Sequence, residues 1–374
     1  MSSPALLLLA ASEREADVYY ATKFLAPDPF ICLQLNGRNI LLMSDLELDR
    51  AKAQARVDEV RSYSQLAAAR KQTLRHEPSM YEVIQGVLAD HGVTELVVPA
   101  ATGIQHVEGL RKLGLTVTFR PDPFFPERLL KSEEEIAHIT ATQRATEAAV
   151  EVAIDLIRRS TIEQDTLVLG GQVLTAEQIK KVIHLHLLER GCIAQHTIVA
   201  CGQQACDPHH EGTGPLRPHQ PIVLDVFPQH MRTRYFADMT RTVVKGKASP
   251  KLKRMYELVG EGQEMGFRMI KAGVNGQAVH QAILDHFTQA GFPTGEQGGR
   301  MQGFFHGTGH GVGLEIHEPP RISPRSDTLQ AGMVVTVEPG LYYLDAGGVR
   351  LEDMVVVTPT GCRNLTQAPK ILEV

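Results

Sequence analysis

Glycine occupies alternate positions of one segment, Phe304–Glu318, at Gly307, Gly309, Gly311 and Gly313. This pattern argues against a helix, because each glycine costs about 1 kcal/mol relative to alanine inside a helix. It suits an extended segment whose backbone packs close to another part of the protein. In such a segment His306, His310 and Glu318 share one face. His317 falls on the opposite face unless a β-bulge redirects it.

Acidic residues occur at matching places in two predicted hairpins on either side of this segment. The strands of these hairpins are expected at Pro221–Asp225 and Arg234–Val244, and at Val334–Gly340 and Gly348–Val357. The acids are Asp225 and Asp238, 13 residues apart, and Glu338 and Glu352, 14 residues apart. An unpaired carboxylate is costly to bury in an apolar strand. Four such acids, together with the glycine-flanked His310, indicate a shared cation.

Helix signals precede both hairpins in the same order. Helices are expected from Ser132 and over Thr175–Arg190 before the first hairpin, and from Ser249-Pro250 and over Gln277–Ala290 before the second. Helix, helix, hairpin therefore occurs twice, with a period near 115 residues. Such an internal duplication would place the two hairpins face to face, so that their four acids converge.

The first part of the chain alternates strand and helix patterns and predicts a small α/β domain. Strands are expected at Ala5–Ala10, Phe30–Leu35 and Asn39–Ser44, helices at Leu46–Val60 and Ser79–His91, and further elements at Glu95–Pro99, Ile104–Leu113 and Thr116–Phe119. Asn36-Gly37 predicts a tight hairpin turn. Three prolines between Arg120 and Pro126 predict the domain boundary, giving domains of residues 1–126 and 127–374.

Composition excludes several classes of function for this chain of 374 residues. The net charge is −5 without a basic run, so no nucleic-acid partner is expected. The apolar stretch from Leu6 to Ala11 is too short to span a bilayer and lacks a preceding positive charge, so it predicts a buried strand and no membrane association. Five cysteines form an odd count in a long chain, which favours free thiols and a cytoplasmic location.

The five candidate ligands are Asp225, Asp238, His310, Glu338 and Glu352. Like charges in one pocket destabilise each other, and two divalent ions would neutralise them. Oxygen donors with a single nitrogen favour Mn²⁺ first, then Co²⁺ or Fe²⁺, over a thiolate or tri-histidine zinc site, although Zn²⁺ stays an alternative. Asp238 and Glu352 could bridge the two ions. A water shared by the ions would then act as a hydroxide nucleophile toward a carbonyl.

This pattern resembles the pita-bread metallopeptidases, specifically the branch of Xaa-Pro dipeptidases (prolidases) and aminopeptidase P. The resemblance implies a creatinase-type α/β N-terminal domain and an α+β pita-bread (creatinase/aminopeptidase-like) catalytic domain with an internal pseudo-twofold duplication. It implies a dinuclear metal-dependent exopeptidase that hydrolyses short peptides, preferably at Xaa-Pro bonds. A homodimer is expected from the resemblance alone.

The resemblance also implies residue roles. Asp225 would bind one metal, Asp238 and Glu352 would bridge, and His310 and Glu338 would hold the other metal. Glu338 would also take the proton of the attacking water. The remaining candidate catalytic residues are His317, which would stabilise the scissile carbonyl, His209, which would contact the substrate near the cleaved bond, His306, which would line the pocket, and Arg350, a cation beside the ligands.

Two features depart from the family pattern. The first hairpin is two residues longer than the usual eleven-residue spacing, with Phe227-Pro228 where a small residue is common. The N-terminal domain is also expected to lack the opening helix of many relatives, since its first strand is predicted almost at Met1. These changes predict a reshaped pocket. Thr240 and Thr242 are candidates for hydrogen bonds to the ligand carboxylates. Two other functions remain open from the sequence: a creatinase-like C–N hydrolase that acts without metal, and a pita-bread binding protein without catalysis.

Overall fold

The computed structural model describes residues 4–374, and the chain divides into two compact units, Met1–Arg128 and Leu129–Val374. The boundary expected at residue 126 falls at a short 3-10 turn, Pro126–Leu129.

The first unit is built on a mixed six-stranded sheet of order β4-β3-β2-β1-β5-β6. Its strands are β1 (Ala5–Ala10), β2 (Phe30–Leu35), β3 (Arg38–Met43), β4 (Glu59–Ser62), β5 (Glu95–Pro99) and β6 (Thr116–Arg120). Its helices are α1 (Ala16–Thr22), α2 (Leu48–Gln54), α3 (Tyr63–Leu74), α4 (Met80–Asp90) and α5 (Ile104–Arg111). The apolar side chains of the strands form two buried clusters, one on each face of the sheet.

In the first unit, the turn residues explain the hairpin of β2 and β3, whereas pairing between strands overrides one helix prediction. Asn36 and Gly37 both have positive φ, 52° and 80°, and join β2 to β3 in a two-residue turn, as predicted. The helix expected over Leu46–Val60 was wrong beyond Gln54. The following residues form β4, which pairs in parallel with β3, so sheet formation wins over helical pattern there. Helices α1 and α3 were not predicted.

The second unit contains two helix pairs. They are α6 (Glu133–Arg159) with α7 (Ala176–Glu189), and α8 (Pro250–Met269) with α9 (Gly276–Gln289). All four predicted helices are confirmed. The predicted caps are also present: Ser132 and Thr175 form capping boxes, and Ser249 caps a helix with Pro250 at its first position.

The strands of the second unit form a three-stranded and a five-stranded sheet beside the acids, and four smaller ribbons of two or three strands. The three-stranded sheet has the order β11-β12-β14, and the five-stranded sheet has the order β18-β17-β19-β22-β23. Their strands are β11 (Ile198–Cys201), β12 (Ile222–Val226), β14 (Met239–Val243), β17 (Gly309–Gly311), β18 (Glu318–Ile322), β19 (Val334–Val337), β22 (Asp353–Val357) and β23 (Cys362–Asn364). The ribbons are β7 (Thr161–Glu163) with β8 (Thr166–Leu169) and β9 (Gln172–Val173), β10 (Cys192–Ile193) with β13 (Gln229–His230), β15 (Gly295–Gln297) with β16 (Arg300–Gln302), and β20 (Gly340–Tyr343) with β21 (Gly347–Arg350).

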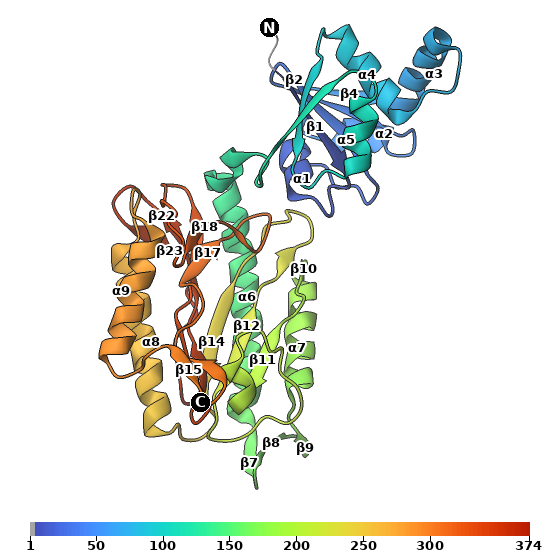
Figure 1. Cartoon of the computed structure of the whole chain (residues 1–374). Helices are drawn as coiled ribbons and strands as arrows, with labels where there is room; N and C mark the ends of the chain where they lie inside the picture. Colours follow the sequence, from blue (N-terminus) through green and yellow to red (C-terminus); the bar gives the residue numbers. More distant parts are fainter. Residues whose placement is uncertain (1–3) are drawn as a thin grey trace. The chain divides into compact units, whose positions relative to one another are not determined.

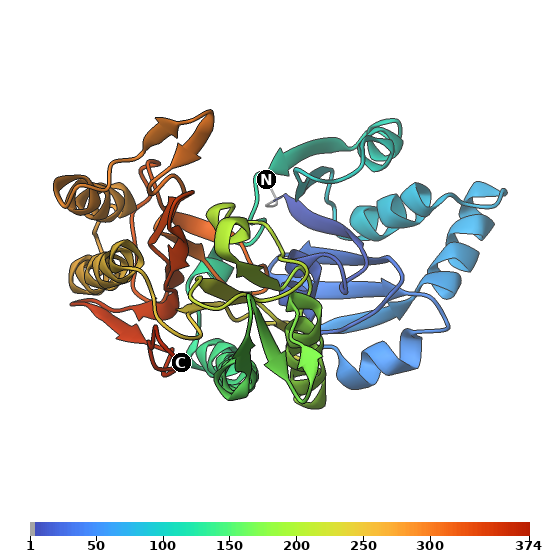
Figure 2. The same cartoon turned by 90° about the horizontal axis from the view of Figure 1, so that it is seen from below.

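Each half of this unit buries its strands under its own helix pair. Residues of α6 and α7 pack with β12 and β14 in one apolar core, and residues of α8 and α9 pack with β19 and β22 in another. The strands lie between the two helix pairs (Figure 1), and Figure 2 shows the same arrangement from below. The duplicated order expected from the sequence is therefore present in space.

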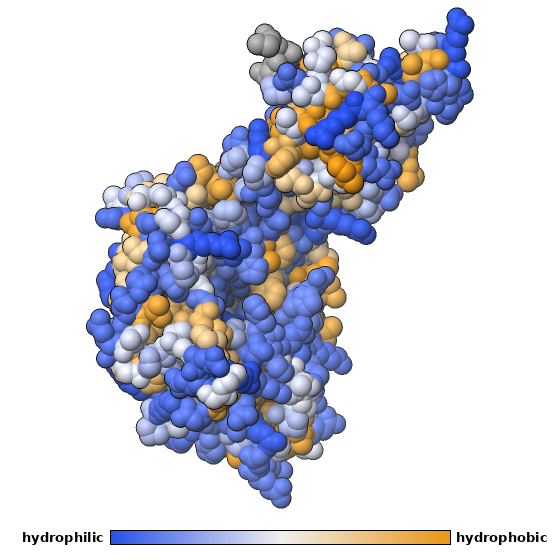
Figure 3. Space-filling model, viewed as in Figure 1, coloured by the Kyte–Doolittle hydropathy of each residue, from blue (hydrophilic) through white to orange (hydrophobic). Residues whose placement is uncertain are grey.

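The face drawn in Figure 3 is mostly hydrophilic, with apolar side chains in separate groups. Within residues 4–374, every helix is too short or too polar to cross a bilayer.

Candidate active site

One cavity of about 740 Å³ within the second unit is lined by every residue expected to act in the chemistry. These are Asp225, Asp238, His310, Glu338, Glu352, His209, His306, His317 and Arg350. The sequence thus selected residues that fold around one space, although they span more than a hundred positions.

The two hairpins carry the four acids to this cavity at equivalent places. Asp225 lies in β12, opposite Thr240 of β14, and Asp238 directly precedes β14. Glu338 directly follows β19, and Glu352 directly precedes β22. Both strand pairs are antiparallel, so the end of one strand lies beside the beginning of its partner.

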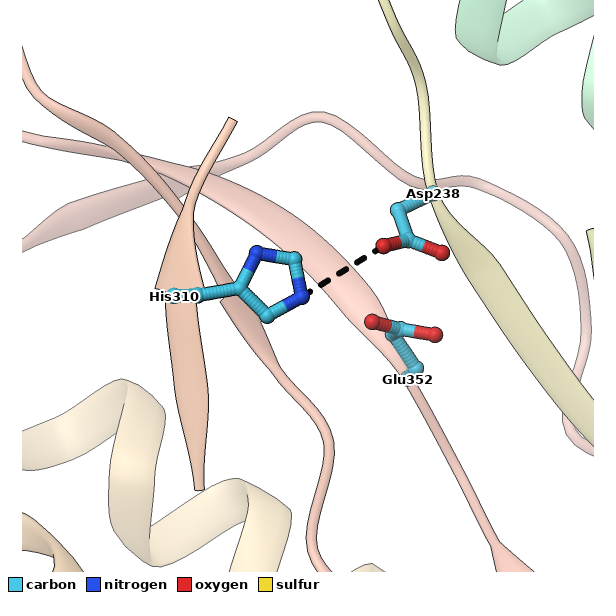
Figure 4. Close-up of side chains that lie close together, drawn as sticks. All are labelled: Asp238, His310 and Glu352. Atoms are coloured by element: carbon cyan, nitrogen blue, oxygen red, sulfur yellow. Dashed lines mark ion pairs between the residues drawn. The ribbon is translucent and has the colours of Figure 1, made fainter. Parts of the chain in front are cut away.

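Three of the side chains lie close enough to share one ion (Figure 4). Asp238, His310 and Glu352 each offer a ligand atom, and these atoms lie within 4.8 Å of one another. The Nε2 atom of His310 lies 3.6 Å from Asp238 Oδ2 and 3.3 Å from Glu338 Oε1. The Nδ1 atom of His310 lies 3.1 Å from the Gly311 carbonyl. Donation from Nδ1 to that carbonyl leaves Nε2 as the ligand atom.

The acids repel one another in the absence of a cation. Burial, followed by the charge of neighbouring carboxylates, raises the pKa of Asp238 and of Glu352 well above their usual range. Burial also raises the pKa of Asp225, against the opposing charge of Arg350. Burial opposes ionisation of Glu338 too, but hydrogen bonding and charge from His310 lower the pKa of Glu338 to about 2.

The donor set fits divalent ions. Oδ2 of Asp225 accepts a 2.5 Å hydrogen bond from Arg350, whereas Oδ1 is buried without a hydrogen-bond partner among residues 4–374. A buried carboxylate oxygen without a partner is costly unless something else coordinates it. Asp225, Asp238, Glu338 and Glu352 with His310 supply hard oxygen donors and a single nitrogen, a donor set that suits divalent ions.

Arg350, Tyr342 and His306 form a hydrogen-bonded chain beside the acids. The Nδ1 atom of His306 lies 2.8 Å from the Gly307 carbonyl, and its Nε2 lies 2.8 Å from the Tyr342 hydroxyl. Burial lowers the pKa of His306 to about 4, so the ring is neutral and Nε2 accepts from the hydroxyl. The same hydroxyl accepts from Arg350 at 2.9 Å. Sequence reasoning missed Tyr342, because an apolar β-strand gave no signal for its hydroxyl.

Threonine hydroxyls donate hydrogen bonds to two of the acids. Thr240 donates to Glu352 Oε2 at 2.7 Å and accepts from Arg350 Nε at 3.1 Å. Thr242 bonds the backbone of Arg350 instead of a ligand, so only Thr240 plays the part expected of the pair. Thr336, which the sequence did not single out, donates to Glu338 Oε1 at 3.2 Å.

The alternating glycines are explained by close backbone approach. A Cβ at Gly309 would lie 2.0 Å from the Thr336 carbonyl oxygen, and one at Gly311 would lie 2.3 Å from the Pro319 carbonyl oxygen. The extended conformation is limited to β17, and a β-bulge follows His310. The rings of His310 and His317 meet edge to face with centroids 4.4 Å apart.

The shared face expected for Glu318 was wrong. Glu318 is absent from the cavity lining and is instead buried against Lys131. The bulge and the bends after β17 break the alternation on which that expectation depended.

His317 and His209 lie at the open part of the cavity. Desolvation, together with the neighbouring His310 and Arg321, lowers the pKa of His317 to about 4. His209 is exposed and lines the cavity, whereas the Nδ1 atom of His210 accepts a hydrogen bond from the Gly212 amide within the same turn.

Apolar side chains complete the cavity wall and were not predicted as a group. They are Ile198, Phe227, Phe305 and Ile316. Ile198 lies opposite Asp225 in the β11–β12 pairing, and Phe227 lies two residues beyond Asp225. The period of two along a strand could have placed Phe227 on the same side as Asp225.

The chain is similar to known proteins over much of its length. Residues 137–359 match the profile of Metallopeptidase family M24. An uncharacterized peptidase of Bacillus subtilis strain 168, YqhT, is 34% identical over 248 residues, which cover 66% of this chain and 64% of that protein. A Xaa-Pro dipeptidase of Pyrococcus horikoshii is 30% identical over 285 residues, or 75% of each chain. The crystal structure of an X-Pro aminopeptidase from Thermotoga maritima superposes with a TM-score of 0.82 at 25% identity, covering 99% of this chain and 97% of that one.

Proposed function

Because this chain belongs to metallopeptidase family M24, we propose that it is a metal-dependent exopeptidase that hydrolyses short peptides, preferably at Xaa-Pro bonds. The observation that carries this proposal is the convergence of Asp225, Asp238, Glu338, Glu352 and His310 in one cavity, beside His209, His306 and His317. The family implies divalent metal ions, and the buried, mutually repelling acids suit them.

We assign the metal ligands as Asp225, Asp238, His310, Glu338 and Glu352, with Mn²⁺ as the first choice of ion. Asp238, His310 and Glu352 place their ligand atoms within 4.8 Å of one another, so they would hold an ion together. When bound, divalent ions would supply polarisation of the peptide carbonyl and would lower the pKa of a water molecule, so that hydroxide could act as the nucleophile.

The remaining residues orient the substrate and move the proton. Glu338 takes the proton of the attacking water, since its carboxylate lines the cavity beside His310. Neutral His317 donates a ring N–H to the oxygen of the tetrahedral species, where charge develops. His209 contacts the substrate near the cleaved bond. Arg350 holds Asp225 in place and, through Tyr342, fixes the orientation of His306.

Support for Xaa-Pro bonds comes from the relatives and from the shape of the site. A Xaa-Pro dipeptidase and an X-Pro aminopeptidase are among the similar proteins. A proline ring needs an apolar surface and makes no amide donor available, which suits a wall of isoleucine and phenylalanine. A volume of about 740 Å³ suits a short peptide.

We propose that the first domain, residues 1–126, is a creatinase-type domain, that residues 127–374 form the catalytic domain, and that the protein acts in the cytoplasm as a homodimer. All five cysteines are free, which fits a reducing compartment. Light scattering of the purified chain tests the dimer.

The test of function is a metal-reconstituted assay. Protein stripped by a chelator and reloaded with Mn²⁺ or Co²⁺ should release the N-terminal residue from Xaa-Pro and Xaa-Pro-Xaa peptides, and far more slowly from matched Xaa-Ala peptides. Asp238→Asn serves as the matched variant and should lose both metal and turnover. Activity of the stripped protein would favour the creatinase-like hydrolase, and metal binding without turnover on any peptide would favour a non-catalytic binding protein.

A further inference from the structure

A buried ion pair lies directly behind the loop that carries His317. Lys131 Nζ donates to Glu318 Oε2 at 2.8 Å, and each side chain is only 1% exposed. Glu318 is the first residue of β18 and the immediate neighbour of His317. The pair lies outside the cavity lining, so neither residue contacts the proposed substrate.

Lys131 is a fixed anchor for this pair. It directly precedes Ser132, the cap of α6. The Lys131 amide donates to the Gly332 carbonyl at 2.9 Å, and its ammonium also donates to the Leu129 carbonyl at 3.3 Å. The position of the ammonium is therefore set by the start of α6 and by the turn that contains Gly332, before β19.

Glu318 connects that anchor to the loop Val312–His317. Its Oε1 accepts from the Glu315 amide at 3.2 Å, so the carboxylate joins Lys131 to the middle of the loop. A Cβ at Gly313 would lie 2.6 Å from Glu318 Oε2, so the loop backbone passes directly over the carboxylate. The Gly313 carbonyl accepts from the Phe236 amide at 2.8 Å, which ties the loop to the first hairpin.

The His317 ring depends on this loop for its place. Among residues 4–374, none forms a hydrogen bond with the ring, whose closest aromatic neighbour is His310. A catalytic group held by its backbone alone is misplaced when the loop shifts, and a displacement of about 1 Å can cost about 100-fold in rate.

We propose that Lys131 and Glu318 are positioning residues that hold the Val312–His317 loop so that His317 faces the scissile bond. This inference rests on the proposed function for its catalytic consequence, but the holding of the loop does not depend on it. A purely structural ion pair is the competing explanation, because buried pairs often contribute to folding without serving chemistry.

A double-mutant cycle separates the two explanations. Glu318→Gln removes the charge and keeps an oxygen for the Glu315 amide, and Lys131→Met removes the ammonium. In the otherwise unchanged enzyme, each should lower kcat by about 10- to 100-fold with little change in KM or metal content. In a His317→Ala background, each should change kcat by less than about 3-fold, because the group they position is gone. Equal losses in both backgrounds would overturn the proposal.

Two further variants keep the test decisive. Glu318→Asp retains the charge and shortens the side chain, so it should fold and still lower kcat. It takes the place of Glu318→Gln in the cycle if that variant does not fold. Thr366→Val is the matched control, since it removes a buried hydroxyl that bonds Gln143 and the Met354 amide away from the cavity. It should lower the melting temperature and leave kcat unchanged.

Hydrogen exchange measured by mass spectrometry gives a readout that does not require turnover. In Glu318→Gln, amides of residues 312–318 should exchange faster, while those of α8 keep their protection. Unchanged exchange in this loop would overturn the holding of the loop even in an active enzyme. A wild-type enzyme without peptidase activity would instead overturn the proposed function, and faster loop exchange would still support the ion pair's role.

Discussion

A single hydroxyl group, that of Tyr342, connects two of the candidate catalytic residues by hydrogen bonds. The Tyr342 hydroxyl accepts from Arg350 and donates to His306, and it is buried. Tyr342→Phe leaves both partners without it, which we expect to reduce the free energy of unfolding by about 1–3 kcal/mol. Turnover should fall as well, because His306 and Arg350 lose their shared contact. Denaturant unfolding and steady-state kinetics measure the two effects.

The neighbouring Tyr343 provides the control for that variant. Its hydroxyl donates to the Pro293 carbonyl at 2.8 Å and is not part of the cavity lining. Tyr343→Phe should therefore cost stability and leave kcat unchanged. If both variants retained full activity, the chain from Arg350 to His306 would have no catalytic role.

Functional residues could be predicted from the sequence where the residue type is unusual for its predicted position, and not where it is ordinary there. Buried acids in apolar strands are unusual, so Asp225 and Glu352 stood out from the sequence alone. Tyr342 and Lys131 did not, since a tyrosine in a strand and a lysine before a helix are ordinary. Their importance follows from partners more than 30 residues away, His306 and Glu318, which only the fold brings to them.

Among the elements, β17 packs closely against both of its neighbouring strands. It lies between β18 and β19, and a Cβ at Gly309 would lie 2.0 Å from the Thr336 carbonyl oxygen. Gly309→Ala must therefore push β17 away from β19, displacing His310. We expect a loss of about 1–3 kcal/mol or more, with reduced metal content, measured by thermal unfolding and elemental analysis.

Gly295 is the matched glycine for that experiment. It lies in β15, its φ is not positive, and a Cβ there would meet no atom within 4 Å. Gly295→Ala should change stability by no more than about 0.5 kcal/mol. Comparable losses in the two variants would mean that the alternating glycines are not required by backbone contact.

The longer first hairpin places Phe227 on the cavity wall beside Asp225. Phe227→Ala removes an apolar contact surface, so we expect KM for Xaa-Pro peptides to rise by about 10- to 200-fold, the usual range for such pocket contacts. Metal content should stay unchanged, because Phe227 supplies no ligand atom. A variant with unaltered KM across a peptide panel would exclude Phe227 from substrate binding.

Elements were predictable where local signals agree with the tertiary structure. Ser132, Thr175 and Ser249 fixed the starts of three long helices because capping is a local interaction. The segment after Gln54 followed no local rule, because β4 gains its hydrogen bonds from β3. The path of residues 312–317 was equally out of reach, since a bulge and a distant lysine determine it.

For the whole molecule, the internal duplication carried the fold prediction. Two copies of helix, helix, hairpin require two equivalent cores, and the acids at the hairpin ends then meet where the copies face each other. The pita-bread fold expected from the resemblance is confirmed by the structural similarity to the X-Pro aminopeptidase. The distances among the acids were not predictable, because they depend on how the two halves pack.

Stability of the whole protein should depend on metal and pH together. In the metal-free protein, burial and the charge of neighbouring carboxylates raise the pKa values of Asp238 and Glu352 from their ordinary values of 3.8 and 4.5. The folded state then keeps protons that the unfolded chain has released. Their contribution to stability is therefore lost as pH rises from those ordinary values through the raised ones.

Bound Mn²⁺ replaces these protons, so the rise in melting temperature on metal addition should grow as pH rises above the ordinary pKa values of the two acids and through the raised ones. Other groups, such as His306 and His317 with pKa values of about 4, affect stability in the same range. The difference between the melting temperatures of metal-loaded and metal-free protein at each pH cancels the effect of these histidines, as far as metal does not change their pKa values. Asp238→Asn, which has lost one of the two protonated acids and a ligand, should show a much smaller metal effect at every pH. A metal effect that stays constant or shrinks as pH rises would mean that the acids are already ionised without metal, and that something other than a cation neutralises them.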